Sequence, residues 1–219
     1  MGSAVHRPGV IVAGLVTCGL LVPACTPGSP AAPESAASRT ASPGTASPAQ
    51  ASPVRVAAQS VRIGRFTQEF DASLTADPAQ GSAVEGLRAA IILWDKSQEN
   101  LTLVSPVTAY VTAGALSNLR ESLVRTKAQD VVLGGTDRWF KTRVVRISSA
   151  SATITTCDDG SKFEEVNPVT GVPDPVYSAP PDLQYAFETW QLVRLDGHWA
   201  ISAVTPVMLP GSLARACQP

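Results

Sequence analysis

Few residues in this sequence have the types and the spacing that catalysis requires. His198 is the one histidine downstream of residue 25, and the strand pattern around it turns its side chain away from the nearest apolar face. The sequence contains no GxSxG, P-loop, GxGxxG or HExxH motif, so it lacks the usual signatures of hydrolases, nucleotide-binding proteins and zinc proteases. We therefore predict no catalytic residue and no cofactor.

Four acidic residues lie close together in the chain: Asp158, Asp159, Glu164 and Glu165. Carboxylate oxygens are the ligands that calcium prefers, but the spacing of these four matches no calcium-binding loop. We expect Asp158 and Asp159 to form a turn with Gly160, and the other two carboxylates to face water. The sequence thus predicts no metal site.

The N-terminus has the pattern of an export signal. Residues 1–9 carry Arg7 and no acid, and thirteen uncharged, mostly apolar residues follow. Spanning a bilayer takes about 20 apolar residues, so this stretch is a signal-peptide core and no membrane span. Residues 22–25, Val-Pro-Ala-Cys, resemble a bacterial lipobox, whose cysteine receives a diacylglycerol thioether. Pro23 departs from the small or β-branched residue that is usual at its position. We predict a lipoprotein signal peptide over residues 1–24 and a lipid anchor on Cys25.

Cysteine parity favours this anchor over simple secretion, which is the alternative. Cleavage after Ala24 removes Cys18 and leaves Cys25, Cys157 and Cys217. Exported proteins tend to pair their cysteines, so if the last two pair, acylation would use the odd one. Two or three acyl chains bind a membrane firmly, since each buried CH₂ contributes ~0.8 kcal/mol. The expected location is therefore the extracytoplasmic face of a cell membrane.

The charge of the chain and the composition of residues 25–55 limit the possible partners and structure of the protein. The chain has 17 basic and 18 acidic residues with no block of like charge, so nothing in it favours a nucleic-acid partner. Residues 25–55 are almost entirely Ala, Ser, Thr, Pro and Gly. Because they can bury little apolar surface, we predict a disordered tether that separates a folded domain from the membrane.

Residues 56–80 form an ambiguous connecting segment. Ile63, Phe66, Phe70 and Leu74 have helical spacing, although Gly64 weakens a helix there. This spacing predicts a short element that packs on the domain, with a partner-binding peptide as the alternative.

Two helices are expected at the start of the folded domain, residues 81–219. Asp77-Pro78 suits a cap followed by proline at the first helical position, and Ser82 offers a second start with capping-box spacing. The apolar stripe of this first helix consists of Val84, Leu87, Ile91 and Trp94. A further helix begins near Thr112, and its expected core stripe consists of Leu116, Leu119, Leu123 and Val124.

The second half of the domain has the alternation of β-strands. Strands are expected over residues 139–147, 152–157, 163–166, 185–195 and 198–205. Asp196-Gly197 is a strong hairpin signal, and a two-residue turn there pairs Leu195 with His198, Leu192 with Ile201 and Trp190 with Ala203. One face of this hairpin is apolar, as expected for a sheet that helices cover on one side.

Helices followed by antiparallel strands indicate an α+β fold. The order of elements, together with residues 112–116, the Cys157-Asp158-Asp159-Gly160-Ser161 segment, residues 196–199 and the late Cys217, resembles the NTF2-like, cone-shaped domains of actinobacterial secreted lipoproteins. The resemblance implies N-terminal helices packed on a curved antiparallel sheet. It also implies a disulfide between Cys157 and Cys217.

NTF2-like domains enclose a cavity between helices and sheet, and some of them are enzymes. The residues expected to line that cavity are Trp94, Tyr110, Trp190 and Trp199. Asp95 and Tyr185 could also approach it, although the pattern locates no acid–base pair. We therefore expect a non-catalytic binding or interaction domain whose partner is an envelope protein or a small apolar ligand. The alternatives are an isomerase-, dehydratase- or hydrolase-type enzyme acting on such a ligand, and a structural envelope component.

Overall fold

The computed structural model describes residues 52–175 and 184–219, which belong to one compact unit. The predicted signal peptide, the predicted anchor at Cys25 and nearly all of the predicted tether lie outside the described residues. The strands are β1 Val54–Val56, β2 Gln59–Ile63, β3 Phe66–Phe70, β4 Ser73–Thr75, β5 Val132–Ile147, β6 Ser151–Val166, β7 Tyr185–Leu195 and β8 His198–Met208. The helices are α1 Pro78–Glu99, the 3₁₀ turn η1 Val107–Ala109, α2 Ala113–Gln129 and α3 Ser212–Arg215.

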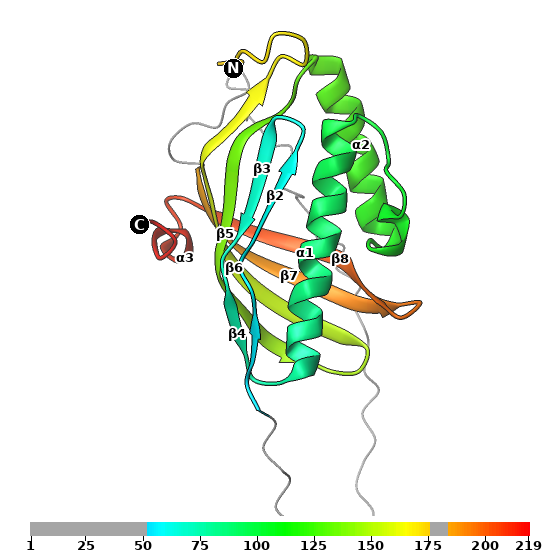
Figure 1. The fold of residues 1–219 in the computed structure, drawn as a ribbon, viewed down its shortest axis with the longest axis vertical. Helices are drawn as coiled ribbons and strands as arrows, with labels where there is room; N and C mark the ends of the chain where they lie inside the picture. Colours follow the sequence, from blue (N-terminus) through cyan, green and yellow to red (C-terminus); the bar gives the residue numbers. More distant parts are fainter. Residues whose placement is uncertain (1–51, 176–183) are drawn as a thin grey trace, which may run out of the picture. The chain divides into compact units, whose positions relative to one another are not determined.

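The main sheet has six strands in the order β2-β3-β5-β6-β7-β8, and β1 pairs separately with β4. All neighbours in the main sheet are antiparallel except β3 and β5, which are parallel because the helical segment containing α1 and α2 connects them. Helices α1 and α2 lie on one side of the curved sheet, and α3 lies on the other (Figure 1). The α+β class predicted from the sequence is confirmed, with the parallel pair as an addition.

Helix α1 begins at Pro78, the first of the two expected starts. The Asp77 carboxylate accepts a hydrogen bond from the backbone N–H of Gln80 at 2.9 Å, which satisfies one of the free donors of the first turn. The expected stripe of α1 is buried in the main core.

Helix α2 begins after Thr112, as the sequence predicts. Leu119 and Leu123 are buried, whereas Val124 is 72% exposed, so its place in the predicted stripe is wrong. Successive residues of a helix point about 100° apart, and with Leu123 against the core its neighbour must turn outward.

Residues 54–75 form strands, so the helical pattern predicted for this segment is wrong. The spacing of Phe66 and Phe70 fits a helix, but it also fits the period of two that β3 adopts, with Gln68 buried between them. Gly64 supplies the positive φ of the turn between β2 and β3, and Leu74 is 76% exposed. This segment therefore supplies two strands to the main sheet.

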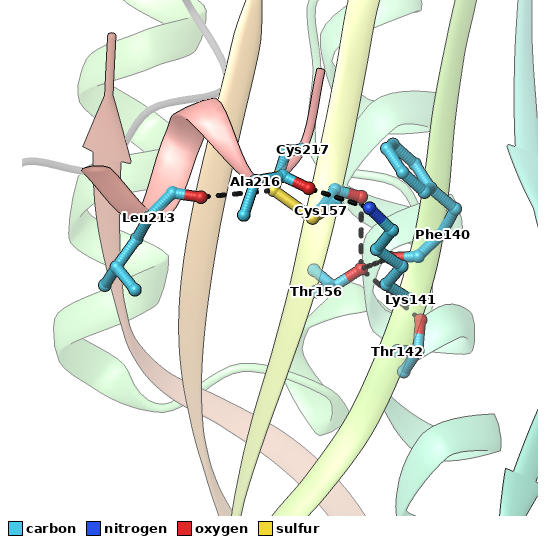
Figure 2. Close-up of a disulfide and its surroundings, with 8 residues drawn as sticks. All are labelled: Phe140, Lys141, Thr142, Thr156, Cys157, Leu213, Ala216 and Cys217. Atoms are coloured by element: carbon cyan, nitrogen blue, oxygen red, sulfur yellow. Dashed lines mark hydrogen bonds between the residues drawn. A yellow bond between two sulfur atoms is a disulfide. The ribbon is translucent and has the colours of Figure 1, made fainter. Parts of the chain in front are cut away.

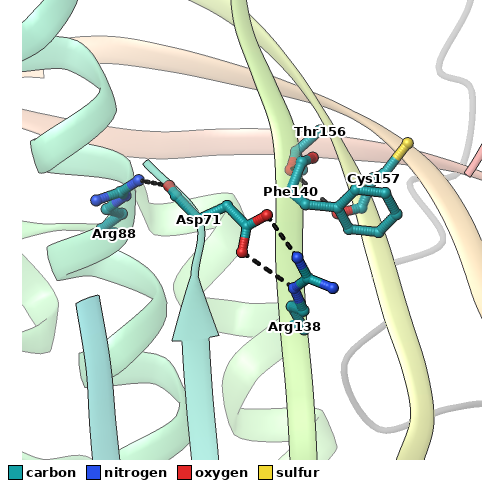
Figure 3. A network of polar contacts seen from close by, with 6 residues as sticks. All are labelled: Asp71, Arg88, Arg138, Phe140, Thr156 and Cys157. Carbon is teal, nitrogen blue, oxygen red and sulfur yellow. Dashed lines mark hydrogen bonds and ion pairs between the residues drawn. The ribbon is translucent and has the colours of Figure 1, made fainter. Parts of the chain in front are cut away.

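Buried Arg88 ties α1 to this N-terminal segment. Its guanidinium donates to the backbone carbonyl of Asp71 (Figure 3). It also donates to the backbone carbonyl of Ala57 at 2.6 Å and lies over the Phe70 ring at 5.3 Å. Burial lowers the pKa of Arg88, while Glu85 and Asp71 act in the opposite direction. The apolar stripe of the helix gave no sign of this buried cation.

Strand β6 runs without interruption from Ser151 to Val166, so the turn predicted at residues 158–161 is wrong. The pairing of β5 with β6 instead shifts register near Asp137, and further along both strands. Gly135 has φ +73°, and a Cβ there would lie 2.0 Å from the carbonyl oxygen of Lys162. A glycine is therefore required at position 135 for β6 to approach β5 this closely. The residues that were predicted to form a turn instead form a β-bulge within the strand.

The β7–β8 hairpin confirms the two-residue turn at Asp196-Gly197. Leu195 pairs with His198 and Leu192 with Ile201, as predicted. A register shift follows, so Trp190 lies opposite Val204 and not opposite Ala203 as predicted. The bulge still keeps the Trp190 and Ile201 side chains in the buried face.

Cys157 and Cys217 form the disulfide that the resemblance implies (Figure 2). Cys157 lies on β6 between Thr156 and Asp158, whose side chains point to the opposite face of the strand. The bond joins β6 to the residues after α3, where the Lys141 ammonium donates to the carbonyl of Ala216 at 2.7 Å. The disulfide thus holds the C-terminus on the face of the sheet away from α1.

Candidate functional site

The face of the sheet that α1 covers carries a group of acids beside tryptophans. Asp95 comes from α1, Asp137 and Trp139 come from β5, and Glu188 and Trp190 come from β7; we call these five residues the acid–tryptophan cluster. Asp95 interacts electrostatically with both of the other acids, and the Trp139 and Trp190 rings lie 5.1 Å apart, so the five side chains meet in one region.

Two of the acids are held in the same way on two strands. The Trp139 Nε1–H donates to Asp137 Oδ2 at 3.1 Å, and the Trp190 Nε1–H donates to Glu188 Oε2 at 3.1 Å. Residues two apart on a strand project from the same face, which brings each indole beside the carboxylate that precedes it. Each carboxylate is thereby fixed in orientation by a buried neutral donor.

The third acid has a strongly altered environment. Burial raises the pKa of Asp95 well above its usual value, and the nearby Asp137 and Glu188 carboxylates raise it further. Asp95 Oδ2 and Asp137 Oδ1 are both buried and accept no hydrogen bond from the described part of the chain. A buried oxygen without a donor loses its hydration without compensation, so these two positions can accept hydrogen bonds from a bound group.

Two further acids are buried, contrary to the prediction of a turn and solvated charges. Asp158 is 5% exposed and lies directly opposite Trp139 in the β5–β6 pairing, so its side chain shares the face of the cluster. Glu165 is 3% exposed, and burial raises its pKa to about 7, although the Arg125 charge opposes the shift. Acidic groups therefore recur along the covered side of β6.

The residues predicted to line a cavity fall into two groups. Trp190 belongs to the acid–tryptophan cluster, while Trp94 and Trp199 are buried in the main core, and partly buried Tyr110 packs against it. The Tyr110 ring lies 5.1 Å from that of His198, which is exposed, as the strand pattern predicts. The structure thus brings one of the four predicted residues into the cluster.

Two surface hollows lie elsewhere and contain none of these four residues. One, of about 390 Å³, lies between α1 and the segment that joins β1 to β2, and it contains Glu85, Arg88 and Ile92. The other, of about 190 Å³, is lined by mixed charges that include Glu69, Arg138 and Lys162.

Sequence reasoning missed Asp137, Trp139 and Glu188, although a signal was present. The chain contains an acid-x-Trp pattern twice, at residues 137–139 and 188–190, within segments that both become strands. The period of two then predicts that acid and indole share a face. What the pattern could not show is that β5 and β7 would bring the two pairs together beneath Asp95.

Within residues 52–175 and 184–219, no three His, Cys, Asp or Glu residues are arranged to hold a metal ion. In the same part of the chain, no helix combines the length and the apolar character needed to cross a membrane.

No family model and no curated protein matches this sequence. The chain is similar in structure to the intermembrane space region of the chloroplast protein ARC6, with 10% identity, a TM-score of 0.35, and coverage of 57% of this chain and 95% of that one. It is also similar to a ketosteroid isomerase-like protein from Erwinia carotovora atroseptica, with 16% identity, a TM-score of 0.35, and coverage of 58% and 96%.

A de novo designed β-sheet protein solved by NMR is 18% identical to the chain, with a TM-score of 0.28 and coverage of 60% of this chain and 92% of that one. At such low TM-scores and identities, none of the three proteins indicates an activity for this chain. The α+β class follows from the arrangement of the chain's own helices and strands.

Proposed function

We propose that this chain is an exported lipoprotein whose α+β domain binds a ligand or partner at the outer face of a cell membrane. The observation that carries the export part of this proposal is the Cys157–Cys217 disulfide. Disulfides persist in oxidising compartments and are rare in the cytosol, so this bond supports the export of the domain.

The anchor part of the proposal rests on the leader and on residues 22–25. With Cys157 and Cys217 joined to each other, Cys25 is the unpaired cysteine after cleavage following Ala24. A diacylglycerol on Cys25 would account for this odd thiol and would attach the tether to the membrane.

Mass spectrometry of the mature N-terminus tests cleavage and acylation together. The proposal predicts a protein that begins at Cys25, carries the mass of a diacylglycerol group and partitions into the membrane fraction. Cys25→Ser should remain exported but leave the membrane, whereas Cys18→Ser, in the leader, should change neither property. A chain that retains Met1 and has reduced cysteines would contradict the proposal.

Binding is favoured over catalysis by the construction of the acid–tryptophan cluster. Asp137 and Glu188 are each held by an indole N–H, and this fixes the acceptors that a ligand would meet. No nucleophile with an adjacent base was found in the sequence, and a fixed set of acceptors is sufficient for recognition.

One observation favours an enzyme as the second candidate. Asp95, whose Oδ2 atom is buried and whose pKa is raised, has the character of a general acid, and the neighbouring carboxylates could serve as bases. Incubation with small apolar ketones and epoxides, followed by NMR of the products, separates the two candidates. Turnover that disappears in Asp95→Asn would favour the enzyme, whereas unchanged substrates would favour a binding domain.

A further inference from the structure

We propose that the acid–tryptophan cluster is a binding site for a primary ammonium group that carries an apolar tail. This inference rests on the proposed binding function and names the chemical class of the ligand. Three carboxyl groups from α1, β5 and β7 supply the acceptors, and the Trp139 and Trp190 rings supply the apolar surface.

The hydrogen bonds of the cluster show where donors are missing. Asp137 Oδ2 already accepts from the Trp139 indole, while Asp137 Oδ1 is buried and accepts nothing from the described residues. Asp95 Oδ2, on α1, is likewise buried and accepts no hydrogen bond from the described residues. An ammonium group has three N–H donors and no acceptor, so it can satisfy these two oxygens and still reach a third.

The charges of the cluster select the sign of the ligand. The groups that act on Asp95 are both acidic, Asp137 from β5 and Glu188 from β7, and no ion pair to Asp95 or Asp137 is found in the described ranges. A cation that entered would be attracted by the Asp137 and Glu188 carboxylates in surroundings of low dielectric constant, and it would favour release of the proton from Asp95. An anion or a further carboxylate would be repelled by the same groups.

The aromatic rings add a preference for an apolar tail. Trp139 and Trp190 are 6% and 5% exposed, and their rings pack at 5.1 Å. Indole faces attract cations and also pack against methylene groups. A quaternary ammonium would meet the rings equally well but cannot donate a hydrogen bond to Asp95 or Asp137, and this difference separates the two kinds of cation.

Three probes of nearly equal tail length test the proposal: n-butylammonium, n-butyltrimethylammonium and 1-butanol. Each is titrated into the purified full-length chain, and tryptophan fluorescence and thermal unfolding are recorded. We expect n-butylammonium to change the fluorescence saturably and to raise the Tm. The other two should bind about tenfold more weakly or worse, since a hydrogen bond to a charged group is worth about 1.5–3 kcal/mol.

Asp137→Asn should weaken n-butylammonium binding by about tenfold, because one charge and one strong acceptor are lost. Glu121→Gln removes the same charge from the exposed face of α2 and should leave binding unchanged. If Asp137→Asn does not fold, Asp95→Asn takes its place.

Equal responses to all three probes, no response to n-butylammonium, or equal losses in Asp137→Asn and Glu121→Gln would each overturn the proposal. None of these results would touch the lipoprotein proposal, whose test is the mass of the mature N-terminus. Conversely, an unprocessed N-terminus would leave a measured ammonium site intact.

Discussion

Two kinds of carboxylate in this protein are treated in opposite ways. Asp71, at the surface, accepts two hydrogen bonds from the Arg138 guanidinium, from Nε to Oδ1 at 3.0 Å and from Nη2 to Oδ2 at 2.7 Å (Figure 3). The Asp71 and Arg138 side chains are 40% and 48% exposed. Asp95 and Asp137, beneath α1, have buried oxygens that accept no hydrogen bond from the described residues. Arg138 thus pairs with Asp71 at the surface, where water could also solvate the carboxylate. Asp95 and Asp137 have no such cation among the described residues.

This contrast indicates that the buried acids are not retained for stability. An exposed ion pair contributes about 0–1 kcal/mol, whereas burying a charge without a partner costs several kcal/mol. Burial raises the pKa of Asp95, because the charged form is disfavoured where its oxygen has no donor. Sites that are costly to the free fold but chemically specific are characteristic of function.

The largest effect should come from the disulfide, which lies on the face of the sheet opposite to the cluster. Its two cysteines are 60 residues apart in the sequence, and the loss of this cross-link should cost about 4 kcal/mol. Urea unfolding of Cys217→Ser, compared with the oxidised wild type, measures this cost. If the double variant with Cys157→Ser is no less stable than the wild type, the bond has no role in holding the scaffold of the site.

A pair of glycine substitutions tests how tightly α1 packs on the sheet. A Cβ at Gly86 would lie 2.5 Å from Trp199 Cβ, so Gly86→Ala should destabilise by about 1–3 kcal/mol, less the gain in helix propensity. Gly114 in α2 has nothing within 4 Å of the same position, and Gly114→Ala should stabilise by up to about 1 kcal/mol. Equal changes in Tm would contradict this account of the packing.

Asp95→Asn should stabilise the domain at pH 8. The raised pKa of Asp95 means that the folded state holds a proton that the unfolded state releases above about pH 4, so wild-type stability falls as pH rises through the folded pKa. The amide has no such dependence, and the two unfolding curves should converge at low pH. A variant that is less stable than the wild type at pH 8 would mean that the ionised carboxylate is needed for folding.

The smallest effect should come from the exposed pair that opens the comparison. Asp71→Asn should cost at most about 1 kcal/mol, because the Arg138 guanidinium regains water when it loses its partner. The cost should shrink further in high salt, which screens exposed charges. If Asp71→Asn instead lost several kcal/mol of stability, and the loss did not depend on salt, the surface and buried carboxylates would not differ as described.

The fold was more readily predicted from the sequence than the site was. Two local signals are correct: Asp77-Pro78 marks the start of α1, and Asp196-Gly197 marks the turn of the β7–β8 hairpin. Phe66 and Phe70 satisfy two periods at once, so only the pairing of β3 with β5 decides between helix and strand. Residues 158–161 have the composition of a turn, but pairing with β5 keeps them extended.

The candidate site depends on contacts between distant segments, which no single stretch of sequence displays. Trp190 was expected to face the helices because its own hairpin determines which side it takes. Asp137 and Glu188 lie on β5 and β7, with the whole of β6 between them in the chain, and they meet only after the three strands assemble in order. The repeated acid-x-Trp pattern could have suggested the two pairs, but not their meeting with Asp95.

We infer that Asp95 and Asp137, beneath α1, have no counter-charge among the described residues and that a bound ammonium supplies one. An NMR titration of the Asp95 carboxyl carbon, assigned by its disappearance in Asp95→Asn, tests this claim most directly. We predict a midpoint well above the value of about 4 that is usual for Asp, and a downward shift when n-butylammonium is added. A midpoint near the ordinary value that n-butylammonium does not move would contradict the account.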